Sequence, residues 1–192
     1  MIGSWTLTTP PAEEPVTLAE IKDHLRVSGT AEDSLLTLYA QMAREAVEEE
    51  TWRALMPQTW TLYLPGWPAN GVIELPRPPL ASVTAITYTD EDGVEGTLAA
   101  SNYRVDTARE PGRVVLAPNG AWPVDALDSV NGVAVEFVAG YADASAVPVT
   151  AKAAILLQIG EIYANREAVI VGSTPQLAPA VARLINLLRA RY

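Results

Sequence analysis

The chain has 192 residues, no cysteine, 49% hydrophobic residues and a formal net charge of −10 at pH 7. This length and hydrophobicity fit one domain with a substantial core, or one domain carrying an inserted subdomain. The missing cysteines exclude disulfides and thiolate metal sites, and the acidic balance argues against a protein that grips nucleic acid, because phosphates are bound by Lys and Arg.

The N-terminal quarter predicts an irregular segment followed by two helices. Residues 1–15 contain three prolines, which disfavour regular structure, and the first ten residues lack the basic and apolar pattern of a signal peptide. Thr17-Leu-Ala-Glu20 is a capping box that starts a short helix, which Ser28-Gly29 ends. A longer helix runs to about Trp52, with apolar residues at helical spacing on one face.

From Gln58 the hydrophobic period changes to two. Six or seven short strands are predicted between residues 58 and 141, separated by turn signals such as Asp90-Glu-Asp-Gly93 and Glu110-Pro-Gly112. The alternation predicts a mostly antiparallel β subdomain over residues 58–141.

The chain then returns to helical spacing. The stretch from Val147 to Ala168 predicts one helix that is apolar on nearly every side, so it is expected to be buried, with Leu156, Ile159 and Tyr163 in the core. A final helix begins at Ala178-Pro179. The predicted fold class is therefore α+β: residues 16–53 and 148–192 form a helical bundle, and 58–141 are inserted between its halves.

No arrangement typical of catalysis or metal binding is found in the sequence. His24 has no second group placed to orient it, and Asp90, Glu91 and Asp92 are contiguous where a calcium loop alternates its acids. We expect no catalytic, metal-binding or cofactor-binding residues. Two alternatives stay open: a hydrolase that uses scattered carboxylates, and a small β-type ligand- or glycan-binding module that uses tryptophans. The residues concerned are Asp106, Glu110, Asp125 and Asp128, and Trp60, Trp67 and Trp122, respectively.

A set of motifs has an order and spacing that resemble the head–tail connector (adaptor) proteins of tailed bacteriophages and gene transfer agents. The resemblance covers roughly residues 15–168. Its motifs are Pro15-Val-Thr-Leu-Ala-Glu20, His24-Leu-Arg-Val27, Arg77-Pro-Pro-Leu-Ala-Ser-Val-Thr84, Asp106-Thr107 with Pro111-Gly-Arg-Val114, Val135-Glu-Phe-Val-Ala-Gly-Tyr141 and Ile162-Tyr-Ala-Asn-Arg-Glu-Ala168.

The resemblance implies a non-enzymatic structural protein. It implies a ring of twelve subunits below the portal, at the head–tail junction of a virion or gene transfer agent particle assembled in the bacterial cytoplasm. Such a ring extends the DNA channel and is the platform for tail attachment. The implied partners are the portal protein, further copies of the chain and a tail-side connector or stopper protein, with DNA only as transit cargo and no membrane. A strongly negative chain suits a channel that DNA crosses without sticking.

Three surfaces are predicted to serve assembly. The apolar run Val169, Ile170 and Val171 is expected to be covered by a neighbouring subunit or the portal. The C-terminal segment is expected to dock on the portal, because it alone has a basic excess; the alternative is that it closes the bundle. Its candidate residues are Arg183, Leu184, Leu187, Leu188, Arg189, Arg191 and Tyr192. Glu48, Glu49 and Glu50 form a candidate acidic channel surface.

Overall fold

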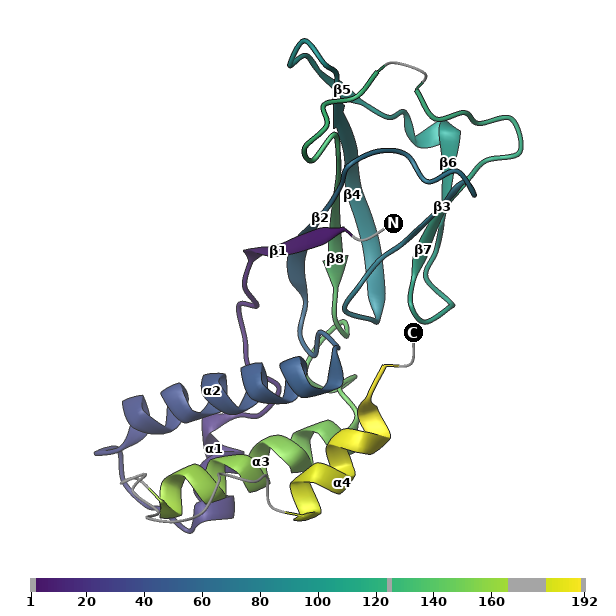
Figure 1. Ribbon diagram of the computed structural model, residues 1–192. Helices are drawn as coiled ribbons and strands as arrows, with labels where there is room; N and C mark the ends of the chain where they lie inside the picture. Colours follow the sequence, from purple (N-terminus) through teal and green to yellow (C-terminus); the bar gives the residue numbers. More distant parts are fainter. Residues whose placement is uncertain (1–2, 124–125, 166–178, 191–192) are drawn as a thin grey trace, which may run out of the picture.

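The computed structural model describes residues 3–123, 126–165 and 179–190, and it has two lobes, one of strands and one of helices (Figure 1). The chain enters the strand lobe, crosses to the helices, returns to complete the strands and ends among the helices. In chain order the elements are β1 (Ser4–Thr9), α1 (Leu18–Leu25), α2 (Asp33–Thr51), β2 (Gln58–Leu64), β3 (Val72–Glu74), β4 (Leu80–Thr89), β5 (Glu95–Thr97), the 3-10 helix η1 (Ala100–Asn102), β6 (Tyr103–Asp106), β7 (Arg113–Leu116), β8 (Val133–Ala139), α3 (Val149–Ala164) and α4 (Pro179–Leu188).

The β lobe consists of two antiparallel sheets that share one core. The larger sheet has the order β1-β2-β8-β4-β5, and the smaller has the order β3-β7-β6. β2 and β8 pair in unbroken register from Gln58↔Ala139 to Leu64↔Val133. Alternate residues of β8 face inward and are completely buried, as the two-residue period of a strand requires; they are Val133, Val135, Phe137 and Ala139.

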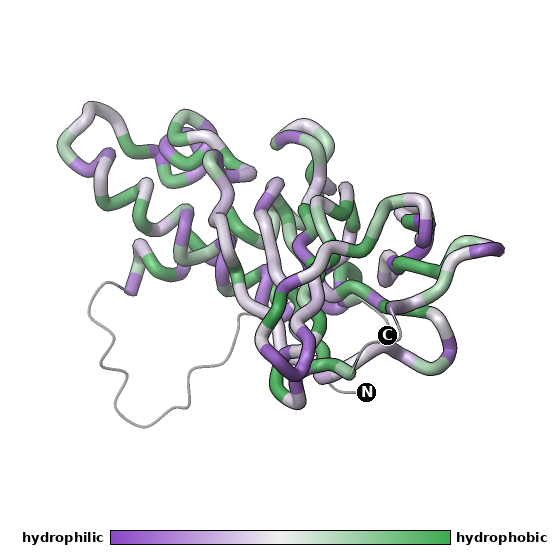
Figure 2. Tube along the Cα trace, turned by 90° about the horizontal axis from the view of Figure 1, so that it is seen from above, coloured by the Kyte–Doolittle hydropathy of each residue, from purple (hydrophilic) through white to green (hydrophobic). Residues whose placement is uncertain are grey.

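The helical lobe is built around α2 and α3, which pack on each other and each contact the other two helices. The capping box of α1 is confirmed, since the Glu20 N–H donates to Thr17 Oγ1 at 3.2 Å and the Thr17 N–H donates to Glu20 Oε2 at 2.7 Å. Seen from above, hydrophobic residues recur along the helices (Figure 2). Helices from the two ends of the chain thus share one core, which includes Leu36, Val47, Ile155, Ile159 and Leu188.

The predicted α+β fold class is confirmed, but two local expectations are wrong. The N-terminal segment is not irregular throughout, because β1 pairs with β2 from Ser4↔Tyr63 to Thr9↔Thr59. Its threonines and Trp5 have high strand propensity, and the prolines start only at Pro10, beyond the strand.

The central helix is also less buried than its composition predicts. Ile159 is fully buried, but Leu156 and Tyr163 are only half-buried, and Val149 and Leu157 are exposed. The neighbouring helices cover only part of its circumference. In the described part of the chain, no helix has the length and apolar character needed to cross a membrane.

Candidate assembly surfaces

A buried charge network joins α2 to the start of the β lobe. Arg44 donates to Glu14 at 2.8 Å and to Glu48 at 2.7 Å. The other carboxylate oxygen of Glu48 accepts from the Leu55 N–H and from the Gln58 side chain, both at 2.7 Å. Glu48 therefore fixes the turn between α2 and β2, and its prediction as part of a solvated acidic surface is wrong.

Burial explains the electrostatics of this network. Desolvation raises the pKa of Glu48, and hydrogen bonds from the Leu55 N–H and the Arg44 guanidinium oppose that rise. Desolvation likewise raises the pKa of Glu14 against the influence of Arg44. The role of Glu48 is visible only in the fold, because two of its partners, Leu55 and Gln58, lie beyond the end of α2.

Glu49 and Glu50 differ from Glu48 because their side chains reach the surface. Glu49 accepts from Arg77 at 2.6 Å, and Glu50 accepts from Arg189 at 3.0 Å. The candidate acidic channel surface is thus reduced to two residues, each of which pairs with an arginine of the same chain. That pairing weakens their repulsion of a passing phosphate backbone.

Arg77 lies at the waist, the junction between the two lobes, and its role was not predicted. Its backbone has a φ of 62°, and its guanidinium lies 5.4 Å from the ring centroid of Trp52 and 5.2 Å from that of Trp60. It also donates to the Glu48 carbonyl at 2.9 Å. Arginine over aromatic rings is a stabilising contact, so Arg77 clamps α2 to the sheet. The motif beginning at Arg77 was noticed in the sequence, but its spacing gives no hint of this contact.

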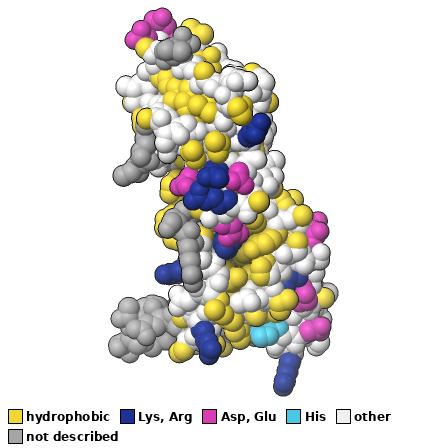
Figure 3. Space-filling model, turned by 90° about the vertical axis from the view of Figure 1, so that its right-hand side faces the viewer, with side chains coloured by type: hydrophobic (Ala, Val, Ile, Leu, Met, Phe, Trp, Pro, Cys, Tyr) yellow, Lys and Arg dark blue, Asp and Glu magenta, His cyan; other side chains and the backbone are white. Residues whose placement is uncertain are grey.

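A second set of ion pairs ties the C-terminal end to the waist between the lobes. Arg53 forms a bidentate pair with Glu110 at 2.9 and 2.5 Å and also donates to the Leu188 carbonyl at 2.5 Å. The Ala190 N–H donates to the Thr51 carbonyl at 2.9 Å. Figure 3 shows basic and acidic side chains gathered at this waist. The C-terminal end of α4 is thereby anchored on its own subunit.

Two of the scattered carboxylates have structural partners. The Arg53 hydrogen bonds lower the pKa of Glu110, and the Arg113 hydrogen bond lowers the pKa of the half-buried Asp106. The described residues contain no group of three His, Cys, Asp or Glu that could hold a metal ion. Asp128 accepts from a backbone N–H in its own turn, and Asp125 lies outside the described residues. The three carboxylates of this set that the structure describes thus each have a hydrogen-bond partner within the protein.

The structure places the predicted docking residues of α4 on both of its faces. Leu188 is buried with Val181 and Ile185, and Leu184 is half-buried against the same core. Arg183 and Leu187 point outward. The α4 helix therefore closes the bundle, and an outward docking role is wrong for Leu188. Arg191, Tyr192 and the run Val169, Ile170 and Val171 lie outside the described residues.

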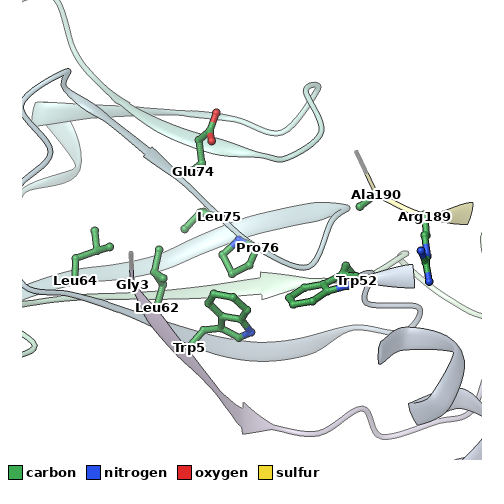
Figure 4. Close-up of a pocket in the computed structure, with 10 residues that line it drawn as sticks. All are labelled: Gly3, Trp5, Trp52, Leu62, Leu64, Glu74, Leu75, Pro76, Arg189 and Ala190. Carbon is green, nitrogen blue, oxygen red and sulfur yellow. The ribbon is translucent and has the colours of Figure 1, made fainter. Parts of the chain in front are cut away.

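An apolar cavity of about 600 Å³ lies beside the waist. Figure 4 shows the indoles of Trp5 and Trp52 along it, with Glu74 and Arg189 on different sides. The two indoles meet edge to face at 6.1 Å. The cavity has few polar groups that could fix the orientation of a ligand, so it lacks the usual features of a specific small-molecule site.

The tryptophans considered for glycan binding are engaged within the protein. Trp67 and Trp122 stack on each other with ring centroids 4.8 Å apart and planes 7° from parallel, and Trp60 lies under Arg77. Each of these contacts occupies one face of an indole ring that a sugar would otherwise be able to stack on.

Residues 15–109 match the family described as "Phage gp6-like head-tail connector protein". The matched stretch, just under half of the chain, is that of a head–tail connector protein. A connector of this family is a structural component, so the resemblance recognised in the sequence is confirmed. Comparison with curated protein sequences found no match.

Solved structures extend the similarity of this connector over its whole length. A chain of "Virion of native gene transfer agent (GTA) particle" has a TM-score of 0.77 and 27% identity, covering 98% of this chain and 96% of that one. A chain of "Neck of empty GTA particle computed with C6 symmetry" has a TM-score of 0.75 and 29% identity, covering 100% and 97%. A chain of "Neck of native GTA particle computed with C12 symmetry" has a TM-score of 0.74 and 28% identity, covering 100% and 97%.

Proposed function

We propose that this connector is the subunit of a twelve-membered ring at the head–tail junction of a phage-like or gene transfer agent particle. The observation that carries the proposal is its full-length similarity, at 28% identity, to a chain of a neck with twelve-fold symmetry. The ring extends the DNA channel and gives the tail its platform. It has no catalytic role, in keeping with the arginine partners of Asp106 and Glu110.

The proposal includes three contacts of the ring. One side binds the portal protein through Val169–Val171, in the stretch of sequence between α3 and α4, and Arg191–Tyr192, which come after α4 in the sequence. The other side binds a tail-side connector or stopper protein. DNA passes through the ring without being held, which the net charge of −10 supports, because like charges repel.

Electron microscopy of the purified protein, alone and mixed with its portal, tests the ring. We expect twelve-fold rings stacked on portals, and we expect particles made without the protein to have DNA-filled heads that lack tails. Tailed particles made in its absence, or a portal mixture that contains only free monomer, would refute the proposal.

The portal contact has a test of its own. Deleting residues 191–192 and replacing Val169 and Ile170 by Asp should abolish portal binding while thermal unfolding of the isolated protein stays nearly unchanged. As a control, Val94→Asp on the turn between β4 and β5 should leave portal binding intact, because Val94 is exposed on the β lobe. Unchanged portal binding in the first variant would show that the contact lies elsewhere.

A further inference from the structure

The α2 helix carries an outward stripe that its own described chain leaves largely exposed, apart from the Arg77 and Arg44 contacts of Glu49 and Glu45. Leu38, Met42, Glu45 and Glu49 are spaced by four, three and four residues, so they lie on one side of the helix. Leu38 is 50% and Met42 is 46% exposed. The opposite side of α2 is buried in the bundle. We call these four residues the α2 stripe.

The α4 helix carries a second outward stripe of different chemistry. Arg183 and Leu187 are one turn apart, and Leu187 is 73% exposed. The opposite side of α4 is the buried one, with Val181, Ile185 and Leu188. We call Arg183 and Leu187 the α4 stripe. Since both helices turn their inner sides to one shared core, the two stripes face outward from it.

The two stripes have complementary charge. The side chains of Glu45 and Glu49 on the α2 stripe are 57% and 68% exposed, and Gln41 holds the Glu45 carboxylate with a hydrogen bond of 2.9 Å. The α4 stripe offers an arginine, which is the cation favoured in protein interfaces. Each stripe also has a large apolar side chain beside its charge.

A ring subunit needs two different contact patches, and the two stripes are candidates for them. Identical subunits related by one rotation contact each other through two different patches. The rotation preserves the height and radius of every residue, so contacting residues of neighbours must lie at the same level. The hydrogen bond from Ala190 to Thr51 brings the waist ends of the two helices together, so distances along both helices can be counted from one point. Counted back from it at 1.5 Å per residue, Glu45 lies about 9 Å and Arg183 about 10 Å away.

We infer that the α2 stripe of one subunit packs against the α4 stripe of the next subunit around the ring. The Glu45–Arg183 ion pair lies at the centre of this contact, with Met42 on its distal side and Leu187 on its waist side. This inference rests on the proposed function, because it supplies the subunit contact of that ring.

Disulfide trapping tests the contact. The chain has no cysteine, so only the introduced cysteines can form disulfides between copies of it. Particles carrying both Glu45→Cys and Arg183→Cys should, after mild oxidation, give a ladder of linked oligomers up to the full ring. A mixture of the two single variants should stop at dimers, and each single variant alone should give monomer. The control pair Val94→Cys with Arg183→Cys should also give monomer, because Val94 lies on the β lobe.

The outcomes separate this inference from the proposed function. Particles that contain the ring but give no ladder would overturn the inference alone, as would cross-linking within one single variant, which indicates a two-fold contact. Absence of any ring in the unmodified protein, with or without portal, would overturn the proposed function and the inference with it.

A charge exchange gives a second, independent readout. Glu45→Arg and Arg183→Glu should each reduce the yield of tailed particles by about tenfold, and the double exchange should restore most of it. Glu91→Arg, in the exposed turn after β4, is the matched control and should have no effect. Thermal unfolding of each isolated variant confirms that the fold is intact. Additive losses in the double exchange would overturn the inference.

Discussion

The two lobes differ in where their exposed large apolar side chains lie. In the β lobe the two sheets cover each other's inner faces, and the large apolar residues left exposed are isolated in turns or on edge strands; they are Leu7, Val94, Val105 and Val130. In the helical lobe the exposed ones recur along helices; they are Leu38, Met42, Val149, Leu157 and Leu187. A pair of sheets can bury its apolar faces within one chain, whereas four helices leave outer faces uncovered. We therefore expect the β lobe to hold its shape alone and the helical lobe to carry the assembly contacts.

The largest loss of stability is expected in the β core. Phe137 on β8 is completely buried, so Phe137→Ala should lower the free energy of unfolding by about 3–5 kcal/mol. Denaturant unfolding measures this loss. Val94→Ala in the exposed turn is the control and should stay within about 0.5 kcal/mol. A small loss for Phe137→Ala would show that the two sheets do not depend on their shared core.

The next effect tests whether α4 belongs to the helical core. Ile185→Ala should cost about 2–5 kcal/mol, because Ile185 is buried against the other helices. Leu187→Ala on the same helix should cost less than about 0.5 kcal/mol in the isolated protein. The reverse ranking in thermal or denaturant unfolding would mean that α4 presents its other face to the bundle.

A buried carboxylate at the waist gives a smaller, pH-dependent effect. Glu48→Ala leaves the Leu55 N–H and the Gln58 amide without their acceptor, at a cost of about 2 kcal/mol. The raised pKa of Glu48 in the folded state means that its carboxyl stabilises most below the ordinary value of 4.5. This contribution declines as the pH rises through the raised pKa, so the deficit of the variant should be larger at pH 4.5 than at pH 8.

Glu48→Gln is the matched control for that effect. Its amide oxygen can still accept from Leu55 and Gln58, so it should recover most of the lost stability. A deficit of Glu48→Ala that grows between pH 4.5 and pH 8 would contradict the raised pKa.

The architecture was predictable because its signals are local. The switch from helical to two-residue period locates the β lobe, and Thr17 with Glu20 fixes the start of α1. The strand β1 was missed because its pairing partner, β2, lies about 50 residues later in the chain. The uncovered side of α3 was also missed, because composition shows that a helix is apolar but not how many neighbours surround it.

The waist contacts were not predictable for a related reason. Glu48 belongs to a run of three acids that looks like a solvated surface, and only the fold brings Leu55 and Gln58 to it. The sequence placed Leu188 on a docking stripe because an amphipathic helix that docks and one that closes a bundle have the same spacing. The family could be recognised because its motifs keep their order, and this does not depend on knowing any contact.

The smallest expected effect concerns the ion pair that links the β lobe to the end of α4. Glu110→Gln removes the bidentate partner of Arg53, but Arg53 still donates to the Leu188 carbonyl, and the Glu110 side chain is partly exposed. We therefore expect a loss of only about 0.2–1 kcal/mol at pH 7. The pKa of Glu110 is lowered in the folded state, so its stabilisation is present above the ordinary value of 4.5 and declines as the pH falls through the lowered pKa. The stability curves of wild type and variant should converge on acidification.

Glu74→Gln is the control, because its pair with Arg109 is longer, at 3.4 Å, and about half exposed on both sides. A Glu110 effect that persists unchanged at pH 3 would show that the carboxylate charge does not hold the two lobes together.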